Sequence, residues 1–440
     1  MNNIKKYFFE KTCNRKKERP TIVSNINAKM QKLGKKNNRL TIRKDTLLYY
    51  LLFNTYGIQK YEVDSQYPYH KSVPSTRGLF TISINIIEYS GGKYFISEFD
   101  NYSNSLINLR YFEGDKLDIF RENLIEGKTV VVFSFDCNIL APIYGEFFYQ
   151  LTLLDCGHIM KHMALLLDRK CVDYTIIPTL GGDEYQLNSL FLDDSFALAV
   201  MLIDAKENNN YLDFYKGTLN PRSTTSMFQK FFPDTFEIYR LTHRSKFPSV
   251  LPISSNPFFL RISEEFFKDL QYNRTSAHNP IGLSGFASYD WENKKKQIID
   301  FCTSLYMKRI KLYIFSINDC SCYRISHGKV KQLDNNFSEL QLDKFLYMYK
   351  TGITLDSLDF IIWLTFDMDA LDTQDSYQLI HFEAGGIMQE ICLFMSQFNY
   401  FCRPIKNNNE KFFKEIFETE LIYTACIGNT IYDNITIDLR

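Results

Sequence analysis

The sequence lacks the patterns that mark proteins of membranes or nucleic acids. Its 51 basic and 51 acidic residues cancel, so no excess of positive charge indicates a nucleic acid or an anionic membrane as a partner. No apolar run approaches the roughly 20 residues that a transmembrane helix needs, and the N-terminal stretch MNNIKKYFFEKTCNRKKERP contains no secretory signal. We therefore expect a cytoplasmic protein that binds neither a membrane nor a nucleic acid.

The cysteines also lack the spacing of a metal site or a disulfide framework. The 10 cysteines are scattered, no C-x-x-C pair occurs, and Cys320 and Cys322 form the only close pair. This spacing disfavours a zinc site or a disulfide framework, and reduced core thiols fit a cytosolic protein. The chain is long and rich in aromatic residues. Its 440 residues are enough for two domains, and its 29 Tyr and 38 Phe are enough to form large buried faces.

An internal repeat organises the chain. The stretch YQLTLLDCGHIMKHMALLL, which starts at Tyr149, aligns with YQLIHFEAGGIMQEICLFM, which starts at Tyr377, at an offset of 228. Upstream, KYFIS and VVVFSFD align with CYRIS and IIWLTFD, and downstream Pro178 aligns with Pro404, all at nearly the same offset. Four matches in one order at nearly one spacing indicate two diverged copies of one unit.

Each copy predicts the same elements. Short runs rich in Val, Ile and Phe, such as FTISINIIEY and IKLYIFSI, predict strands, whereas residues 145–168 predict a long helix that is apolar nearly all round and therefore buried. We expect an α+β fold. The expected divisions are a basic N-terminal segment (1–20), a first unit (21–205), a connector with one or two short elements (206–255) and a second unit (256–440).

The stretch LLDCGHIMKHMALLL at 153–167 raises the question of a reactive site, because it gathers Asp155, Cys156, His158 and His162. The second copy keeps only the carboxylate and the Gly two positions later. Neighbouring helix positions point about 100° apart and cannot converge on one ion, although His158 and His162 at i, i+4 could. We therefore predict no metal site, and a helix at the junction of the two units whose Gly marks a close backbone contact.

Several stretches resemble one enzyme family. YGEFFYQLTLLDCGHIMKHMALLL and the following TIIPTLGGDEYQLNSLF resemble the C-terminal half of SagB/McbC-type azoline oxidases, which have the flavin-dependent nitroreductase fold. KSVPSTRGLFTISINI at 71–86 is similar to the family's P-S-x-G-G-L-Y-P strand entry, FFEKTCNRKK to its N-terminal motif, and LLYYLLFNTYGIQ to its helix ending in Tyr-Gly. The resemblance covers most of residues 5–205. In the second copy, NRTSAHNPIGL at 273–283 is similar to the family's Arg-Arg-Ser-x-Arg flavin-phosphate motif.

The resemblance implies an FMN enzyme. Enzymes of this fold are typically homodimers with two FMN sites at the subunit interface, so a tandem duplication would fuse two nitroreductase-like units into an intramolecular pseudo-dimer. One FMN site would combine a phosphate clamp of the second unit with a turn of the first. The residues implied in cofactor binding are Arg274, Thr275, Ser276 and His278 in the clamp, Pro74 and Ser75 in the turn, and Arg403 and Pro404 in the second unit.

The chemistry of the cofactor agrees with these residue types. A phosphate requires fixed cationic and hydroxyl donors, and a planar ring requires an apolar slot with few placed polar groups. The reciprocal site would combine Lys36, Asn37 and Arg39 with Cys302 and Thr303, where the family's pattern is degraded. We therefore predict one FMN site per chain.

The activity that the resemblance implies is the oxidation of thiazolines or oxazolines to thiazoles or oxazoles in a ribosomally made peptide, such as a thiopeptide or bacteriocin. Tyr144 is the candidate catalytic residue, but Ile143 holds the place of the family's lysine and can neither accept nor donate a proton. The implied partners are the precursor peptide, a cyclodehydratase and a leader-peptide-binding protein. Two alternatives stay open: a scaffold or peptide-recognition subunit that has lost its chemistry, and a general NAD(P)H-dependent nitroreductase.

Overall fold

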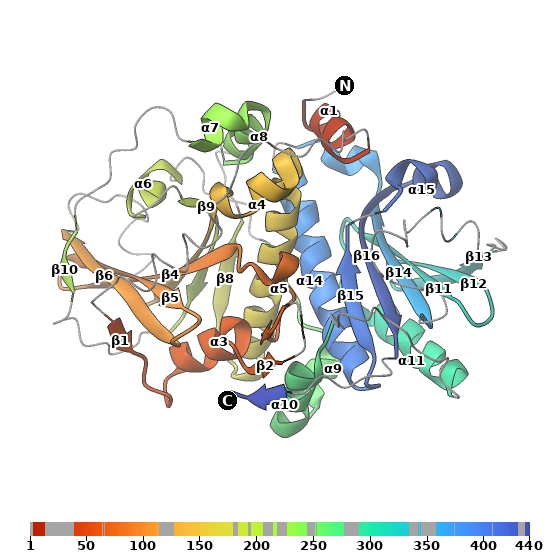
Figure 1. The fold of residues 1–440 in the computed structure, drawn as a ribbon, viewed down its shortest axis with the longest axis horizontal. Coiled ribbons are helices and arrows are strands. Elements are labelled where there is room, and N and C mark those ends of the chain that lie inside the picture. The colour runs from red at the N-terminus through yellow and green to blue at the C-terminus, as the bar shows by residue number, and fades with distance from the viewer. Residues whose placement is uncertain are drawn as a thin grey trace.

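Two sheets lie on either side of a central pair of helices in the computed structural model (Figure 1). Among the described residues, no helix is both long and apolar enough to cross a membrane. The structure describes residues 3–13, 39–63, 65, 67–113, 127–178, 184–191, 195–205, 214–217, 227–243, 251, 253–276, 290–333, 342, 344, 358–373, 375–406, 408–429 and 436–440.

The first sheet has the strand order β1-β6-β5-β4-β7-β9-β8, with β10 also paired to β6. Its neighbours are antiparallel except for β10 and β6. Strands β7 and β9 are buried on both faces, as expected for apolar runs such as VVVF and ALAV that do not alternate with polar residues. The strands are β1 (Arg39–Thr41), β4 (Ile82–Ser90), β5 (Lys93–Asp100), β6 (Ser105–Glu113), β7 (Thr129–Asp136), β8 (Tyr174–Ile177), β9 (Ser195–Ile203) and β10 (Tyr215–Lys216).

The second sheet repeats this order as β13-β12-β11-β14-β16-β15, antiparallel throughout. Each aligned pair of stretches falls on corresponding strands, with KYFIS and CYRIS on β5 and β12, and VVVFSFD and IIWLTFD on β7 and β14. The predicted duplication and the α+β class are thus confirmed. The strands are β11 (Lys311–Ser316), β12 (Ser321–Ser326), β13 (Lys329–Leu333), β14 (Phe360–Phe366), β15 (Phe401–Ile405) and β16 (Glu420–Gly428).

The central pair consists of the two repeated helices, α5 (Phe148–Arg169) and α14 (Ser376–Ser396). They lie side by side between the sheets, one from each unit (Figure 1). Every residue from Phe148 to Leu167 is buried, as predicted for a helix that is apolar nearly all round. The two units therefore share one core through these helices.

The two ends of the chain cross over to the opposite unit. Helix α1 (Asn3–Phe8) packs on the second unit, where the Phe8 ring lies 5.0 Å from the Phe366 ring and Lys5 pairs with Asp372 at 2.6 Å. The C-terminal strand β17 (Thr436–Asp438) pairs with β2 (Lys60–Glu62) of the first unit, which also pairs with β3 (Tyr69–His70). This exchange adds contacts that hold the units together.

The connector contributes two short helices, α7 (Met227–Phe231) and α8 (Pro233–His243). Phe228 and Tyr239 from these helices pack edge-on against Phe135 of β7, so the connector covers part of the first unit's core. The remaining elements are η1 (Phe9–Cys13), α3 (Leu47–Tyr56), η2 (Thr76–Gly78), α4 (Cys137–Tyr144), η5 (Gly145–Phe147), α6 (Glu184–Ser189), α9 (Pro257–Arg261), α10 (Glu264–Asn273), α11 (Trp291–Ser304), η8 (Met368–Leu371) and α15 (Glu410–Phe417).

Candidate functional site

The two units meet most closely where α5 crosses α14. A Cβ atom on Gly157 would lie 2.5 Å from the Phe382 carbonyl oxygen, and one on Gly385 would clash with the Leu154 carbonyl oxygen. Side chains do not approach backbone atoms so closely, so both positions require glycine. The close backbone contact predicted from the shared Gly is confirmed.

The carboxylate of the first copy holds the segment that precedes β4. Asp155 accepts hydrogen bonds from the Thr76 amide at 3.0 Å, from the Thr76 hydroxyl at 3.0 Å and from the Thr81 hydroxyl at 2.8 Å. Burial raises the pKa of Asp155 to about 6, while these donors and Lys71 act to lower it. From its place in α5, Asp155 thus holds the turn at residues 74–80 in position, and we call it the latch carboxylate of the first unit.

The carboxylate of the second copy does the same for the segment that precedes β11. Glu383 accepts hydrogen bonds from the Lys308 amide at 2.6 Å and the Arg309 amide at 2.8 Å, and it pairs with the Arg309 guanidinium at 3.3 Å. Both units therefore use the repeated carboxylate to position the entry to their first long strand. Only the second unit also uses it to pair an arginine.

The latched turn of the first unit has an unusual backbone. Arg77, Gly78 and Phe80 have φ angles of 51°, 60° and 50°, in a region that costs free energy for residues other than glycine. The Ser75 hydroxyl is buried and has no hydrogen-bond partner among the described residues. A strained turn with an orphaned hydroxyl is typical of a segment shaped for a ligand rather than for its own stability.

Arg274 of the second unit reaches this segment across the junction. Its Nε and Nη2 donate to the Lys71 carbonyl at 3.3 and 2.9 Å, its Nη1 donates to the Ser276 hydroxyl at 3.4 Å, and its Nη2 lies 3.5 Å from His70 Nδ1. Arg274 is buried. Arg274 of the predicted clamp therefore contacts Lys71, three residues before Pro74 of the predicted turn. Most of its guanidinium donors already bind protein atoms.

The rest of the predicted clamp lies against strand β15. The Cys402 amide donates to the Thr275 carbonyl at 3.0 Å, and the Ser276 hydroxyl donates to the Cys402 carbonyl at 3.5 Å. Arg403 and Pro404 follow directly in β15, where they pair with Cys426 and Ala425 of β16. The structure thus brings Arg274, Thr275, Ser276, Arg403 and Pro404 together, whereas His278 lies outside the described residues.

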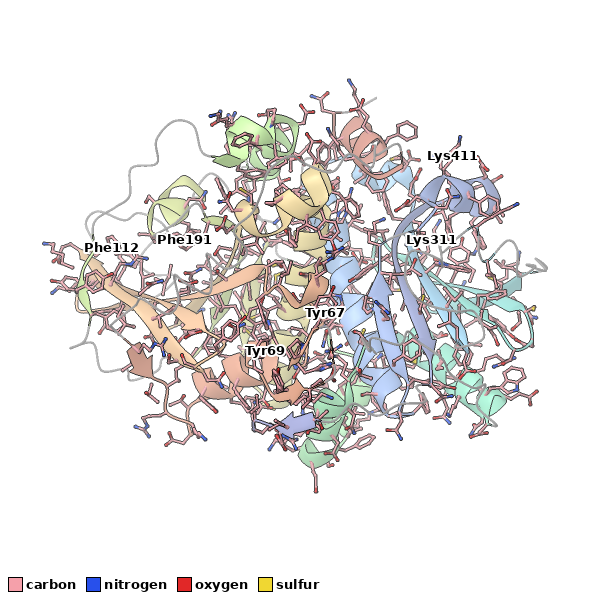
Figure 2. The ribbon with its side chains drawn as sticks, viewed as in Figure 1. Tyr67, Tyr69, Phe112, Phe191, Lys311 and Lys411 are labelled. Atoms are coloured by element: carbon pink, nitrogen blue, oxygen red, sulfur yellow. The ribbon has the colours of Figure 1, made fainter. Side chains whose placement is uncertain are left out.

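Tyr144, the predicted catalytic residue, lies at the end of α4 and faces the same turn. The Arg77 guanidinium carbon lies 5.5 Å from the centre of its ring. Burial raises the pKa of Tyr144, and the charge of Arg77 acts to lower it. Tyr67 and Asp155 are the other titratable groups near its hydroxyl, and Figure 2 shows Tyr67 close to the boundary between the units.

Sequence reasoning missed Lys71. Its ammonium lies 3.2 Å from the centre of the Tyr56 ring and 3.3 Å from that of Phe80, and it is buried. It brings a positive charge between two rings at the base of the turn. A single lysine ahead of a Pro-Ser turn has no distinctive spacing, so only the three-dimensional arrangement reveals it.

The histidines of α5, His158 and His162, form a polar network between the two central helices. His158 Nδ1 lies 3.1 Å from the Gln389 amide oxygen and its Nε2 lies 3.3 Å from the Tyr423 hydroxyl, while His162 Nδ1 lies 3.0 Å from Gln389 Nε2. Burial lowers the pKa of both histidines to about 3, so they are neutral at neutral pH. Among the described residues, no three His, Cys, Asp or Glu side chains gather as metal ligands would.

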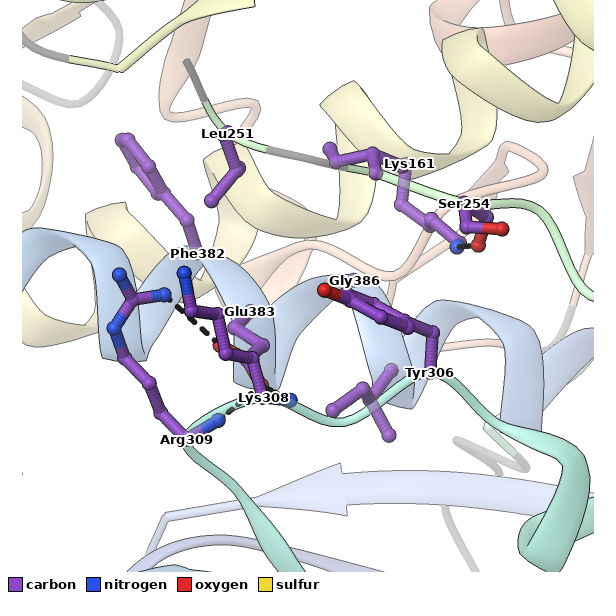
Figure 3. A pocket seen from close by; sticks show the side chains of 11 residues that line it. Lys161, Leu251, Ser254, Tyr306, Lys308, Arg309, Phe382, Glu383 and Gly386 are labelled. Carbon is purple, nitrogen blue, oxygen red and sulfur yellow. Dashed lines mark hydrogen bonds and ion pairs between the residues drawn. The ribbon is translucent and has the colours of Figure 1, made fainter. Parts of the chain in front are cut away.

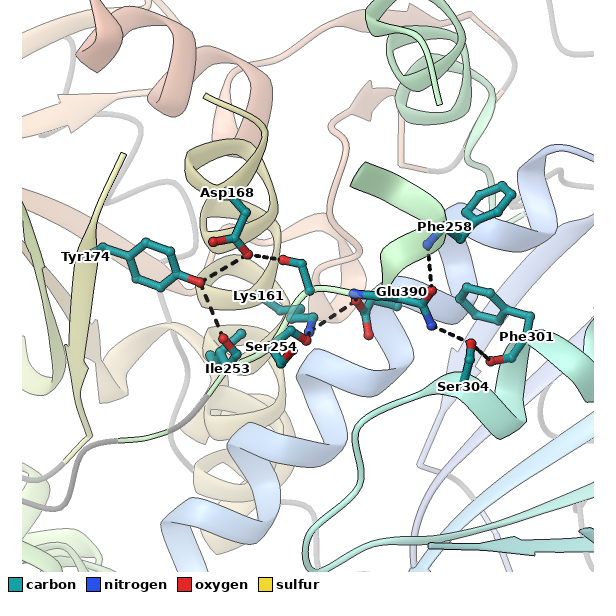
Figure 4. A network of polar contacts seen from close by, with 11 residues as sticks. Lys161, Asp168, Tyr174, Ile253, Ser254, Phe258, Phe301, Ser304 and Glu390 are labelled. Atoms are coloured by element: carbon teal, nitrogen blue, oxygen red, sulfur yellow. Dashed lines mark hydrogen bonds and ion pairs between the residues drawn. The ribbon is translucent and has the colours of Figure 1, made fainter. Parts of the chain in front are cut away.

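The connector fills the opposite side of the junction. Lys161 pairs with Glu390 at 3.1 Å and donates to the Ser254 carbonyl at 2.6 Å, and the Asn256 amide donates to Glu390 at 2.8 Å (Figure 4). The Ser255 hydroxyl also donates to Asp168. By the pseudo-symmetry of the repeat, residues 253–256 lie where a reciprocal composite site would fall.

A small pocket remains beside this part of the connector (Figure 3). Its volume is ≈ 30 Å³, room for about two water molecules. Lys161 and Ser254 line it from the first unit and the connector, and Tyr306, Arg309 and Gly386 line it from the second unit. It is too small for a flavin.

The described residues of the reciprocal site lie in different elements. Arg39 lies in β1 at the edge of the first sheet, where it pairs with Asp100 at 3.8 Å. Cys302 and Thr303 lie near the end of α11, and Lys36 and Asn37 lie outside the described residues. The degraded reciprocal pattern therefore stays a prediction. In the second unit, Lys308 and Arg309 contact the repeated carboxylate where Thr76 contacts it in the first.

Comparison with known proteins shows the fold. No protein-family model and no curated protein match the sequence. A solved structure from Anabaena variabilis, of a protein provisionally named a nitroreductase, is 18% identical with a TM-score of 0.62, and the match covers 87% of each chain. It therefore spans both units, and the chain has a nitroreductase-like fold in two tandem units.

Two other solved structures match about one unit. A protein from Ralstonia eutropha, also provisionally named a nitroreductase, is 13% identical, covers 46% of this chain and 91% of its own, and has a TM-score of 0.28. The Escherichia coli microcin synthetase complex with a truncated pro-microcin bound is 15% identical, covers 45% of this chain and 73% of its own, and has a TM-score of 0.29.

The donors at the turn side of the junction fit a flavin mononucleotide in chemical type. The Ser75 hydroxyl is buried and has no partner among the described residues. Arg403 in β15 and Ser276, whose hydroxyl donates to the Cys402 carbonyl, belong to the other unit. A phosphate and a polar ring edge require donors of these kinds. Arg274 fits less well in the arrangement seen, because it is committed to the Lys71 carbonyl.

Proposed function

We propose that the chain binds one FMN on the turn side of the junction and uses it to oxidise thiazolines or oxazolines in a ribosomally made peptide. The observation that carries this proposal is the meeting of the latched turn of the first unit with the segment 274–276 and strand β15 of the second. A composite site requires residues from both units on one side of the central helices, and this side has them.

The proposed roles follow from position. Ser75 and Ser276 would donate hydrogen bonds to the cofactor, Arg403 would supply a positive charge, and Pro74 and Pro404 would shape the slot. The remaining predicted cofactor residues Arg274, Thr275 and His278 keep their proposed place at the phosphate end. FMN, when bound, supplies the acceptor for a hydride.

Tyr144 is the proposed catalytic group, as a proton donor or hydrogen-bond donor rather than as a base. Burial raises the pKa of its hydroxyl, so the phenol stays protonated at neutral pH and can donate to a ring nitrogen or oxygen of the substrate. Ile143 cannot assist it. On this proposal, the proton acceptor of the reaction is a group other than Tyr144 and Ile143.

A single site per chain is supported by the course of the connector. Residues 253–256 are held across the reciprocal side by Lys161 and Glu390, both of which are buried. Displacing the connector would leave these two charges without their backbone partners, which costs free energy in a buried place. We therefore propose a single site, on the side that residues 253–256 do not cross.

Flavin binding and product analysis test this proposal. We expect purified protein to retain added FMN, and a precursor peptide already carrying azolines to lose two hydrogens per ring, measured by mass spectrometry. Ser75→Ala and Ser276→Ala should weaken FMN binding about tenfold each, since a hydrogen bond to a charged group contributes about 1.5 kcal/mol. Ser254→Ala is the matched control on the connector side, where only the backbone carbonyl is used.

A second candidate function is a scaffold or peptide-recognition subunit of the same pathway. The burial of Arg274 against backbone atoms and the isoleucine at position 143 favour it. A colourless preparation that takes up no FMN but binds the precursor peptide would select the scaffold. Consumption of NAD(P)H with a nitroaromatic and no azoline oxidation would instead select a general nitroreductase.

The proposed setting is a biosynthetic complex in the cytoplasm. An azoline oxidase needs a cyclodehydratase to supply the azoline ring, and a leader-peptide-binding protein would deliver the precursor peptide to both enzymes. Co-purification of the chain with these partners, dependent on the leader segment of the peptide, is the expected result.

A further inference from the structure

The small sheet that joins the two units buries its polar face. Strand β2 lies between β17 of the second unit and β3, and its polar residues Lys60 and Glu62 are both buried. His70 of β3 shares this inner face, where its Nε2 lies 3.0 Å from Glu62 Oε1 and its Nδ1 lies 3.5 Å from Arg274 Nη2. Successive side chains of a strand lie on opposite faces, so Tyr61 lies on the outer face. Sheets with one exposed face normally expose polar side chains and bury apolar ones, and this sheet does the reverse.

The outer face of the small sheet carries adjoining apolar side chains. Ile437 of β17 is opposite Tyr61, and Tyr61 is opposite Tyr69 of β3, so the three cross the sheet side by side. Ile437 is 52% exposed and Tyr69 is 38% exposed. Tyr102, whose ring centre lies 5.5 Å from that of Tyr69, is 37% exposed, and Leu439 is 47% exposed. We call these side chains the apolar row: Tyr61, Tyr69, Tyr102, Ile437 and Leu439.

The apolar row continues into the strained turn. The ring of Tyr102 lies 5.5 Å not only from that of Tyr69 but also from that of Phe80, which has a φ of 50°. Phe80 in turn packs edge-on against Tyr56, with ring centres 6.1 Å apart. Rings in contact therefore lead from the exposed surface to the turn at residues 74–80 that the latch carboxylate holds.

The composition of the apolar row determines which partner can cover it. None of its five side chains is charged, and tyrosine rings pack best against other flat rings, edge-on or offset. Adjoining exposed apolar side chains mark interaction sites. Five side chains are far fewer than the roughly 20 residues that each partner of a stable protein interface contributes, so the row alone would hold a second copy of the chain too weakly. A short segment that carries neutral planar rings matches the row in size and in chemistry.

We propose that the apolar row is the docking surface for the segment of the substrate peptide that already carries azole rings. The inference rests on the proposed function, because thiazoles and oxazoles are neutral planar rings that accumulate in a peptide as its azolines are oxidised. Finished rings pack along Tyr69 and Tyr102 while the next azoline lies at the turn, since the ring contacts join these two places. The row thus makes the protein prefer a partly oxidised peptide to an unmodified one.

Two synthetic peptides of equal length test the docking surface, one with two thiazoles and one with unmodified cysteines at the same places. Each is labelled and titrated with the full-length protein, and fluorescence anisotropy gives the affinity. Wild type should bind the thiazole peptide about fivefold more tightly than the unmodified one, an effect in the range of an aromatic contact. Tyr69→Ala and Tyr102→Ala should each remove about that factor, whereas Tyr69→Phe should keep it, because the ring makes the contact.

Tyr306→Ala is the matched control. Tyr306 is 50% exposed but lines the small pocket on the connector side, so its loss should change the affinity for the thiazole peptide less than about twofold. Thermal unfolding separates loss of binding from loss of folding. If loss of the contact with Phe80 prevents Tyr102→Ala from folding, Ile437→Ser at the other end of the row takes its place, with a smaller loss of affinity expected.

Equal affinity of wild type for the two peptides, or wild-type affinity for the thiazole peptide in both alanine variants, would overturn the inference. A dimeric wild type that Tyr69→Ala makes monomeric, with peptide affinity unchanged, would assign the row to an interface between copies and also overturn it. FMN titration and azoline oxidation separate the two proposals. If wild type oxidises azolines and the variants bind and oxidise as it does, only this inference fails. If wild type prefers the thiazole peptide through the row but binds no FMN, only the proposed function fails.

Discussion

The two units share a fold but differ in the segment that leads into the first long strand. In the first unit, residues 57–81 separate α3 from β4 and contain β2, β3 and the strained turn. In the second, only residues 305–310 separate α11 from β11. The latch carboxylate is kept in both units, yet among the described residues only the first unit holds a long segment with a strained turn on it. The fold supplies the frame, and the loop decides where a site can form.

The two sides of the central helix pair differ in the same sense. Positions 161 and 389 correspond in the repeat, as do 162 and 390. On the connector side they contribute the ion pair between Lys161 and Glu390, and on the turn side they contribute the neutral contact between His162 and Gln389. The face of the helix pair on the connector side therefore carries an ion pair that binds the connector, which we call the tether. The face on the turn side carries a neutral hydrogen-bonded pair.

The largest expected effect comes from breaking that tether. Lys161→Met should destabilise the protein by about 3–5 kcal/mol, because it leaves Glu390 as a buried carboxylate without its cation. Urea unfolding measures the change. The paired variant Lys161→Met/Glu390→Leu should recover most of the lost stability, and FMN binding on the turn side should survive in it. Equal destabilisation by the single and paired variants would contradict this account of the tether.

The crossing of α5 and α14 gives the next effect. Gly385→Ala should cost about 2–3 kcal/mol in free energy of unfolding, because the added methyl would meet the Leu154 backbone. Its neighbour is the control: a Cβ atom on Gly386 would lie 3.3 Å from Lys161 Cβ, a tight contact, but 3.8 Å from the backbone oxygen of Gly157, so it would meet no backbone clash. Gly386→Ala should therefore cost less than about 1 kcal/mol. Similar losses for both variants would argue against a glycine-specific contact.

Acid should lower the free energy of unfolding through His158 and His162, the histidines between the two central helices. Burial lowers the folded-state pKa of His158 and His162 to about 3, from 6.5. Their contribution to stability is therefore complete above pH 6.5 and is lost as the pH falls toward 3. At pH 5 the loss is about 2 kcal/mol for each. Asp155, whose pKa is raised to about 6 by burial, acts in the opposite direction.

Unfolding free energies at pH 7.5 and pH 5 test the histidine prediction. His162→Gln should reduce the acid-induced loss by about 2 kcal/mol relative to wild type. His243→Gln should reduce it by a similar amount, since burial also lowers the pKa of His243 to about 3, but it lies outside the junction and should not alter FMN binding. An acid response identical to that of wild type in both variants would contradict the prediction.

Substitutions of the two latch carboxylates, Asp155 and Glu383, should have similar effects on stability but different effects on FMN binding. Asp155→Asn and Glu383→Gln each disturb a set of three hydrogen bonds and should each cost about 1–3 kcal/mol. Only Asp155→Asn should also weaken FMN binding, because only its turn faces the proposed site. Flavin fluorescence titration of both variants distinguishes them, and equal binding would remove the reason for treating the units as different.

Much of the fold was predictable from the repeat. The aligned stretches fall on α5 and α14 and on corresponding strands, because apolar periodicity and the shared Gly leave a strong signal in sequence. The exchange of the chain ends was not predictable. Helix α1 and strand β17 are short and occur once each, so neither repetition nor periodicity indicated which unit they would join.

The candidate site was predictable in part. Pro74, Ser75 and the segment 274–276 were placed on one composite face by their positions in the two copies, and the structure brings Arg274 to the Lys71 carbonyl, three residues before Pro74. The partner of Arg274 and the pairing of Arg309 depend on side-chain geometry, which sequence spacing does not contain. For the same reason the path of residues 253–256 through the junction could not be inferred.

The central claim is that the duplicated chain carries one composite flavin site on the turn side of its junction. Equilibrium dialysis of the full-length protein against FMN, followed by absorbance of the bound flavin and a protein assay, measures the stoichiometry directly. The account predicts one FMN per chain, reduced by Ser75→Ala on one unit and by Ser276→Ala on the other. Two FMN per chain, no FMN, or one FMN that neither variant affects would contradict it.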